Sequence, residues 1–502
     1  MKLSEYLLIG YISIMLPGIV ISQTIDVKTM PLISTSQFNL APAYNGGLGG
    51  ISIALDDPLA DGFVNPARLS AVENNLFFGG PYRDSWSQAD RGWWSTEQQG
   101  SMVQGSYGGF ILHHSPKSMG LKISIMAASS MEQLRHRSHV RQYWNPETGE
   151  PNGPMQTSVM NWPMSAGVAA FYPQRNISIG FGIDRVNLRG IDGLALFYPG
   201  AVELRQNGAL TNYRLGLSWI QPRDGRLDIL LFHKNYHLNQ HAVYEWDPDI
   251  HNKDGERSWL AQVKGKLPSE DPVRLAVELT GQYKWHPKIP DYPSPEIRIP
   301  RDPGNTKAVR FGLGISNHQG KRLTTAIDWA MEVIDSKTWG DTTAPVVVSD
   351  TKTIKAGDPL FSNDYFITSA TIKLGAEYVL NSQIRIQGGW AAKQFSLDYY
   401  HEDFVTGEQI TATPQDWWIE RNLTAGLVAD FGQLEAIYQF SRHTGTGMPY
   451  ANTTWWGWRF GGVFDMATAS AGDILVPPTG LDFDKTPVVL HRLTLVFRLD
   501  ER

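Results

Sequence analysis

The sequence contains no cysteine among its 502 residues. This absence excludes a disulfide framework, a zinc site with cysteine ligands and a thiol nucleophile. Charged residues are also scarce: they make up 19% of the chain, whereas a soluble domain of average composition has about 25%. The net charge of −6 is spread along the chain and does not indicate nucleic acid as a partner.

Long apolar runs are absent beyond the first two dozen residues. No later stretch reaches the ~18 consecutive apolar residues of a transmembrane helix. At the start of the chain, Lys2 precedes an apolar run over 6–21, and small residues suit a cleavage before Gln23. We therefore expect residues 1–22 to be a secretory signal peptide, with an uncleaved N-terminal anchor as the alternative.

Glycine and aromatic residues are abundant, with 48 Gly, 17 Trp, 19 Tyr and 20 Phe. They occur in segments with a period of two, such as the one in which Ile177, Ile179 and Phe181 alternate with Ser and Gly. Because the side chains of a strand point to opposite faces in turn, each such segment has one apolar and one polar face. The same pattern recurs in 212–219, 309–316 and 384–390.

A soluble β-sandwich would show the same alternation, but two features favour a membrane barrel. The polar faces are rich in Gly, Ser, Thr and Gln, while the apolar faces end in aromatics such as Trp219, Trp285 and Phe431. Short turns also alternate with long polar connections, as periplasmic turns and outer loops do in outer-membrane barrels. The expected long outer loops are 129–163, 185–210, 237–256, 286–306, 334–368 and 396–419.

The sequence thus predicts an all-β fold, a transmembrane antiparallel β-barrel over residues 74–502 with sixteen strands. An even number leaves both ends of the barrel in the periplasm, and the strand-like segment Trp456–Phe464 is assigned to the last outer loop. The expected strands lie near 74–82, 101–114, 119–128, 164–173, 176–185, 211–221, 226–236, 257–267, 273–285, 307–318, 321–333, 369–380, 383–395, 420–431, 433–443 and 488–499.

Residues 23–73 do not alternate and contain three dense turn motifs. Glycines at such density mark backbone that turns tightly or approaches other backbone closely, and Asp-Pro and Asn-Pro mark turns. A large barrel would otherwise leave an open lumen, so we expect this segment to be a Gly-rich plug. Its motif residues are Gly46, Gly47, Gly49, Gly50, Asp56, Asp57, Pro58, Asn65, Pro66 and Ala67.

The runs Gly46–Pro58 and Asn65–Leu69 resemble the N-terminal region of the FadL superfamily of outer-membrane proteins. That superfamily includes FadL-type transporters of hydrophobic compounds and PorV/PorQ-like proteins, whose closing strand resembles His491–Leu495. Arg68 stands where the family usually has Gly. The resemblance implies fourteen strands, so a barrel of 14–16 strands is expected.

The resemblance also implies a function in the cell outer membrane. A FadL-like channel would take up a hydrophobic or amphipathic small molecule, with the plug as its gate. The alternative is a PorV-like scaffold that binds protein partners of a secretion or assembly machine. The Pro-rich loop 287–303 and the tryptophan groups at 93–94, 417–418 and 455–458 suit that alternative.

Motifs of enzymes and cofactor sites are missing from the sequence: it has no Gly-x-Ser-x-Gly, Walker loop, dinucleotide fingerprint or His-Glu-x-x-His. His233, His237 and His241 would point the same way on a strand, but the first and last would lie ~26 Å apart. We therefore expect no enzyme activity, no cofactor and no metal. A calcium site among the acidic residues of 247–256 is the open alternative.

Overall fold

The computed structural model describes residues 42–91, 96–116, 120–138, 155–192, 202–243, 249–286, 304–320, 322–341, 345–349, 351–407, 409–446 and 486–499. The expected signal peptide and residues 23–41 lie outside these ranges, as does the segment Trp456–Phe464. In the described ranges, no helix has the length and apolar character that a membrane crossing requires.

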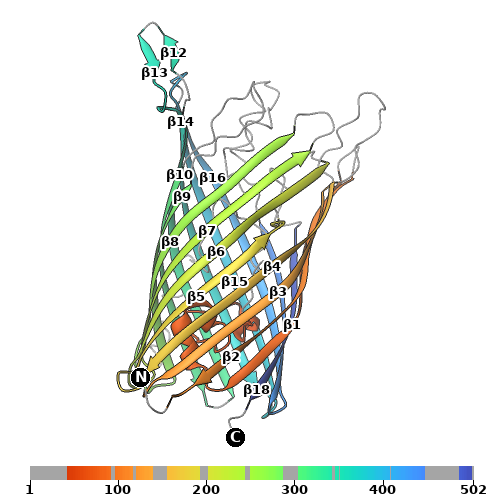
Figure 1. Ribbon diagram of the computed structural model, residues 1–502, viewed down its shortest axis with the longest axis vertical. Helices are drawn as coiled ribbons and strands as arrows, with labels where there is room; N and C mark the ends of the chain where they lie inside the picture. The colour runs from red at the N-terminus through yellow and green to blue at the C-terminus, as the bar shows by residue number, and fades with distance from the viewer. Residues whose placement is uncertain are drawn as a thin grey trace, which may run out of the picture.

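Sixteen strands close into one antiparallel barrel, in which β1 (Asn75–Arg91) pairs with β18 (Val488–Leu499) (Figure 1). β12 (Val346–Ser349) and β13 (Lys352–Ile354) form a separate hairpin beyond the long-loop end. The other barrel strands are β2 (Thr96–His114), β3 (Lys122–Ser138), β4 (Met155–Tyr172), β5 (Ile177–Leu188), β6 (Glu203–Ile220), β7 (Arg226–Val243), β8 (Ile250–Lys266), β9 (Val273–His286), β10 (Gly304–Gln319), β11 (Leu323–Asp341), β14 (Pro359–Val379), β15 (Ile384–Asp403), β16 (Gln409–Asp430) and β17 (Leu434–Thr446).

Each predicted strand overlaps one strand of the barrel, so the antiparallel barrel is confirmed with sixteen strands rather than fourteen. The predicted outer loops are too long. β7 continues to Val243 and β15 to Asp403, inside the expected loops 237–256 and 396–419. Beyond the lipid the outward face no longer needs apolar side chains, so the alternation fades, while pairing of the backbone amides continues.

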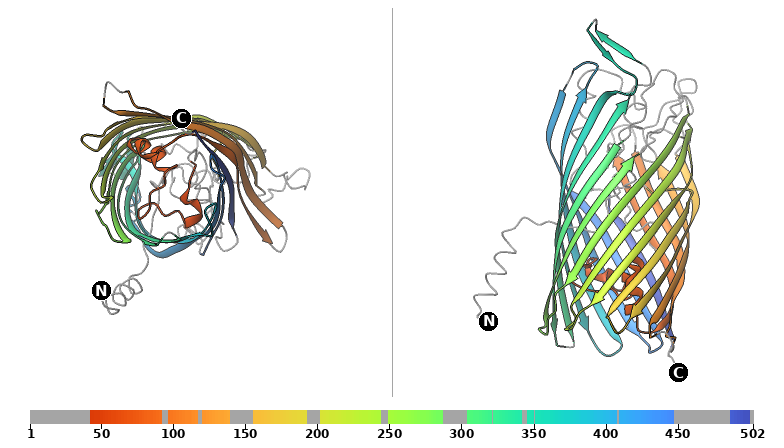
Figure 2. Two further views of the ribbon diagram at one scale, coloured as in Figure 1. Left: turned by 90° about the horizontal axis from the view of Figure 1, so that it is seen from below. Right: turned by 60° about the vertical axis from the view of Figure 1, so that its left-hand side comes forward.

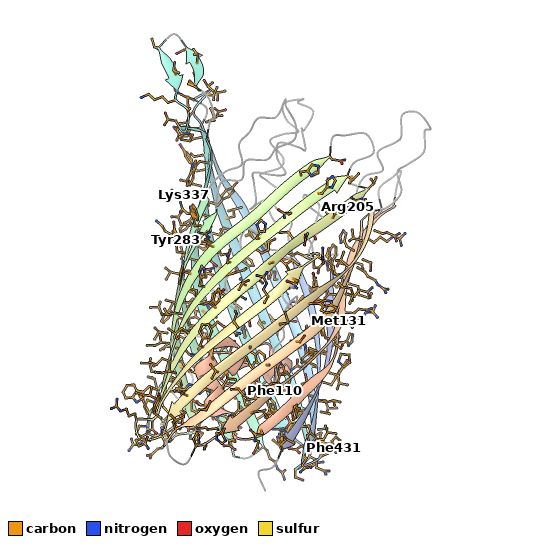
Figure 3. All side chains as sticks on the ribbon, viewed as in Figure 1. Phe110, Met131, Arg205, Tyr283, Lys337 and Phe431 are labelled. Carbon is orange, nitrogen blue, oxygen red and sulfur yellow. The ribbon has the colours of Figure 1, made fainter. Side chains whose placement is uncertain are left out.

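The outside of the barrel is apolar over most of its height. Phe181, Leu279 and Val309 are about half exposed there, and Figure 3 shows side chains such as Phe110 and Phe431 projecting from the wall. The aromatics Trp219, Trp285 and Phe431, expected in the girdles, are exposed as well. Such a surface requires lipid as its solvent, so the barrel spans a membrane.

Residues 42–74, called the inner segment below, lie inside the barrel near the short-turn end (Figure 2). They form three short helical turns: η1 (Asn45–Leu48), α2 (Asp61–Val64) and η2 (Pro66–Ala71). Leu59, Phe63 and Leu69 are buried against apolar side chains of β1, β2 and β3. Burial of each such side chain stabilises the packed state by roughly 1.5–3 kcal/mol. One side of the inner segment is therefore held by hydrophobic contact.

Glycines on the inward face of the wall leave room for the backbone of the inner segment. A Cβ on Gly389 would overlap the amide of Gly49, and one on Gly216 would overlap the side-chain oxygen of Asn65. A Cβ on Gly314 would likewise overlap the backbone amide of Ala54. The small residues on the polar faces of these strands therefore mark where the inner segment docks.

We predict that Gly389→Ala destabilises the protein by about 1–3 kcal/mol, because the new methyl group displaces the Leu48–Gly49 backbone. The adjacent Gly388 has no atom within 4 Å of an added Cβ, so Gly388→Ala is a matched control. The free energy of unfolding can be measured from urea titrations in detergent. Equal stability of the two variants would contradict the docking of Gly49 against this strand.

Candidate functional site

The glycine run of the inner segment is bound through its backbone. Thr424 of β16 donates its hydroxyl to the carbonyl oxygen of Gly47 at 2.8 Å and accepts from the amide of Gly49 at 2.7 Å. Lys373 of β14 donates to the carbonyl oxygen of Gly50 at 2.5 Å. Gly49 and Gly50 both have φ of 71°, which glycine adopts without strain.

Gly46, also in the motif, lies in η1 against the side chain of Gln439, which would overlap a Cβ at this position. Gln439 of β17 donates to the carbonyl oxygen of Ala43. The absence of a side chain at Gly46 thus allows β17 to bind the start of the inner segment.

Asp328 of β11 holds the next stretch. Its carboxylate accepts hydrogen bonds from three successive backbone amides, those of Ser52 at 2.7 Å, Ile53 at 2.9 Å and Ala54 at 2.7 Å. Consecutive amides that converge in this way form a concave binding site for an anion. Lys264 of β8 donates to the carbonyl oxygen of Ser52 at 2.5 Å, so both sides of this turn are tied to the wall.

Asp56 joins an ion-pair cluster between the inner segment and the wall. Arg226 of β7 donates to both oxygens of the Asp56 carboxylate, and Lys266 lies 3.3 Å from it. Arg68 lies 3.2 Å from Asp61 and 3.7 Å from Asp56. Burial works to raise the pKa of Asp56, but Arg226, Arg68 and Lys264 outweigh it and hold that pKa well below its usual range.

Asp57 serves a different purpose, since it organises the inner segment itself. Its carboxylate accepts from the amides of Asn45 at 2.7 Å, Leu59 at 3.0 Å and Ala60 at 3.0 Å. These bonds connect the glycine run to the turn that follows the exposed Pro58. Burial raises the pKa of Asp57 to about 6 despite these hydrogen bonds, and the charge of Asp61 acts in the same direction.

The Asn-Pro-Ala motif forms a docked helical start. The Asn65 side chain caps η2 by accepting from the amide of Ala67 at 3.1 Å, and Pro66 occupies the first helical position, where its missing N–H costs nothing. Ser178 of β5 donates to the carbonyl oxygen of Ala67 at 2.8 Å. The side-chain amide of Asn65 also donates to the carbonyl oxygen of Ile229 in β7 at 3.4 Å, so the motif is bound to both β5 and β7.

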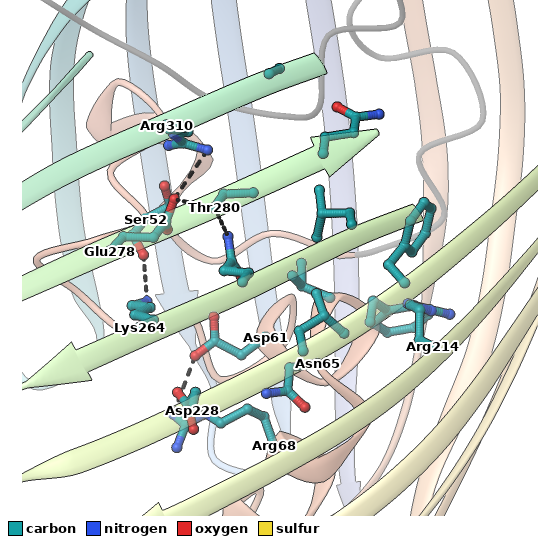
Figure 4. A pocket seen from close by; sticks show the side chains of 18 of the residues that line it. Ser52, Asp61, Asn65, Arg68, Arg214, Asp228, Lys264, Glu278, Thr280 and Arg310 are labelled. Atoms are coloured by element: carbon teal, nitrogen blue, oxygen red, sulfur yellow. Dashed lines mark hydrogen bonds and ion pairs between the residues drawn. The ribbon is translucent and has the colours of Figure 1, made fainter. Parts of the chain in front are cut away.

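A cavity of about 370 Å³ lies between the inner segment and the wall formed by β5 to β11 (Figure 4). Its lining combines apolar side chains with charged ones, many of which are paired. Arg214 pairs with Asp184, and Arg310 lies 3.2 Å from Glu278. The apolar lining residues are Phe63, Val64, Leu230, Phe232, Leu260 and Ala308, and the charged ones are Asp61, Arg68, Asp184, Arg214, Asp228, Lys264, Glu278, Arg310 and Glu332.

The sequence motif identifies the inner segment but not its partners on the wall. The missed residues include Asp328, Arg226 and Lys373, which bind the inner segment from β11, β7 and β14. A signal for them exists, because each is a charged residue at an inward position of an alternating strand. Arg68, noted only as a departure from a family pattern, is a buried member of the ion-pair cluster.

The other candidate residues do not converge on the cavity. His233, His237 and His241 follow one another along the outward face of β7 and form no joint site. Trp417 is exposed, whereas Trp418 is buried and stacks on Phe395 with ring centroids 4.8 Å apart. The tryptophans at 93–94 and 455–458 lie outside the described residues, as do the side chains of Asp247, Asp254 and Glu256.

Comparisons with known proteins give structural likenesses only. No family model matches the chain, and no curated protein matches it. Among solved structures, the toluene transporter TodX of Pseudomonas putida is 12% identical, with 95% of this chain and 100% of that chain covered and a TM-score of 0.42. A FadL homologue of Pseudomonas aeruginosa is 12% identical, with coverage of 96% and 100% and a TM-score of 0.36.

OmpT, an outer membrane protein of Vibrio cholerae, is 8% identical in a form that lacks one loop, with coverage of 85% and 100% and a TM-score of 0.34.

We predict that the inner segment is more stable in mild acid than at neutral pH. The pKa of Asp57 is about 6 in the folded protein, against an ordinary value of 3.8. Its contribution to stability is therefore complete below the lower value and is lost as the pH rises through the higher one. Between about pH 7.5 and pH 5 the gain should be roughly 1 kcal/mol.

Hydrogen–deuterium exchange of residues 42–74, corrected for the intrinsic effect of pH, measures this difference. Asp57→Asn removes the titrating group and should abolish the pH dependence. A wild-type protein that is equally protected at both pH values would show that Asp57 stays ionised, held by its three amide donors.

Proposed function

We propose that this protein is an outer-membrane channel for a small molecule with an apolar body and a polar or charged head. In this proposal residues 1–22 direct export, residues 23–73 act as a plug, and residues 74–502 form the barrel. The observation that carries the proposal is the cavity beside the inner segment, whose lining is both apolar and charged. Its volume of about 370 Å³ lies in the range of small-molecule sites.

The mixed lining favours an amphipathic molecule over a purely apolar one. Phe232 and Leu260 offer an apolar surface for a hydrocarbon chain. Near them, Arg214 and Arg310 are paired with carboxylates of the wall. A guanidinium has five N–H donors, and the Nε atoms of Arg214 and Arg310 have no hydrogen-bond partner among the described residues. An anionic head could bind such a donor while the wall carboxylate stays paired, so that no buried charge is left without a partner, which would be costly.

The contacts of the inner segment suggest how the channel opens. Apart from the hydrophobic contacts of Leu59, Phe63 and Leu69, the contacts described above between this segment and the wall are hydrogen bonds and ion pairs. Among them, Arg226 of β7 pairs with Asp56. Arg68 lines the cavity, pairs with Asp61 within the inner segment and lies 4.0 Å from Asp228 of β7. A charged head that competes for Arg68 would weaken the link to the wall, and the flexible backbone at Gly49 and Gly50 could then swing.

The scaffold alternative depends on outer loops and tryptophan groups that mostly lie outside the described residues. The cavity at the inner segment would have no purpose in a barrel that serves only as a docking platform. For this reason we propose the channel as the function.

We predict that Leu260→Trp lowers uptake of an amphipathic probe at least about ten-fold, because the larger side chain fills the cavity against Phe232. A fluorescent alkyl carboxylate is a suitable probe, and its accumulation can be measured in cells that carry the protein in their outer membrane. Ala261→Trp is the matched control, since Ala261 is the neighbouring residue on the lipid face of β8. Equal uptake by both variants would contradict passage through this cavity.

A further inference from the structure

Three potential metal ligands meet on the outward face of the barrel, at the long-loop ends of β7 and β8. His241 and His251 are directly opposed across the two strands, and their rings stack with centroids 3.9 Å apart. The Oδ2 atom of Asp249 lies 2.9 Å from the Nε2 atom of His241. One ligand atom from each of the three side chains lies within 4.8 Å of the other two.

The backbone ladder brings these side chains together. His241 and His251 share a cross-strand position, where Cβ atoms are typically about 5 Å apart. Asp249 is two residues before His251 and so points to the same face of the chain. His233 and His237 also lie on this face of β7, but neither is grouped with a carboxylate and a second histidine within the described ranges.

The local charge suits a cation. Arg205 of β6 lies opposite His241 across the strands, and Figure 3 labels it near this end of the barrel. Its positive charge is matched by Glu203, which accepts from Arg205 at 2.7 and 2.9 Å. The carboxylate of Asp249 then leaves the group with net negative charge when the histidines are neutral.

We propose that His241, Asp249 and His251 bind a divalent transition-metal ion such as Zn²⁺. Two imidazoles and one carboxylate are ligands that such ions prefer over Ca²⁺ or Mg²⁺, and three protein ligands leave one position open. Around tetrahedral Zn²⁺ the ligand atoms lie roughly 3.4 Å apart, a spacing that small rotations of these partly exposed side chains can reach. The ion replaces the proton between His241 and Asp249, and it fastens the ends of β7 and β8 together.

This site is separate from the proposed channel, because its residues face away from the lumen and are absent from the cavity lining. It differs from the expectation of no metal and from the calcium site considered in the same loop. Asp249 belongs to that acidic cluster, but its partners are two histidines rather than further carboxylates.

Isothermal titration of the full-length protein with Zn²⁺ tests the proposal, with a purification that uses no polyhistidine tag. The wild type should bind one equivalent in the micromolar range, and His251→Ala should weaken that binding at least about ten-fold. His237→Ala is the control on the same face of the same strand and should bind as the wild type does. Because His237 and His251 are exposed, heat-modifiable migration on gels should show that both variants fold.

The spectrum of bound Cu²⁺ reports directly which side chains are metal ligands. A histidine with a purely structural role would leave this spectrum unchanged when it is replaced. Electron paramagnetic resonance of the wild type should show coupling to two nitrogen nuclei, and His251→Ala should reduce this to one. The proposal is wrong if the wild type binds Zn²⁺ only at millimolar concentration, or if His237→Ala and His251→Ala weaken binding equally.

Discussion

The structure depends on one constraint: a segment of irregular backbone buried inside a barrel must find partners for its amide and carbonyl groups. In the inner segment the wall supplies many of these partners. Asp328 accepts from three successive amides, and Thr424 and Lys373 bind the glycine run. An unpaired buried backbone group costs about 1–3 kcal/mol, so the charged side chains of the lumen are required for this packing.

The lumen is divided as a consequence. Apolar side chains of β1, β2 and β3 pack against Leu59, Phe63 and Leu69, whereas the strands from β5 to β11 present charged and polar groups beside apolar ones. The cavity lies where these two kinds of contact meet the inner segment. In the proposed channel, this arrangement would give a molecule with one apolar and one polar end a place to bind, against the ion pairs of Arg68.

The sequence is sufficient to predict the barrel but not the contacts within it. Alternation of period two locates all sixteen strands, because one face of each must meet lipid over the membrane. The alternation underestimates the length of the strands at the long-loop end, because the outward face no longer meets lipid there. The pairing of Asp56 with Arg226 or of Gly49 with Gly389 joins residues more than a hundred positions apart, and no local pattern encodes which wall residue meets which turn.

In the proposed channel, the inner segment must leave the wall for transport to occur. The chain has no cysteine, so Ser52→Cys with Lys264→Cys introduces a single pair of thiols, at positions that a hydrogen bond now joins. A short bis-methanethiosulfonate forms a reducible disulfide with each cysteine and releases methanesulfinate, and it would fix the segment to β8. We predict that uptake of the alkyl carboxylate stops on cross-linking and returns on reduction, while either single variant treated with the reagent transports normally. Unchanged uptake through the cross-linked protein would contradict the account.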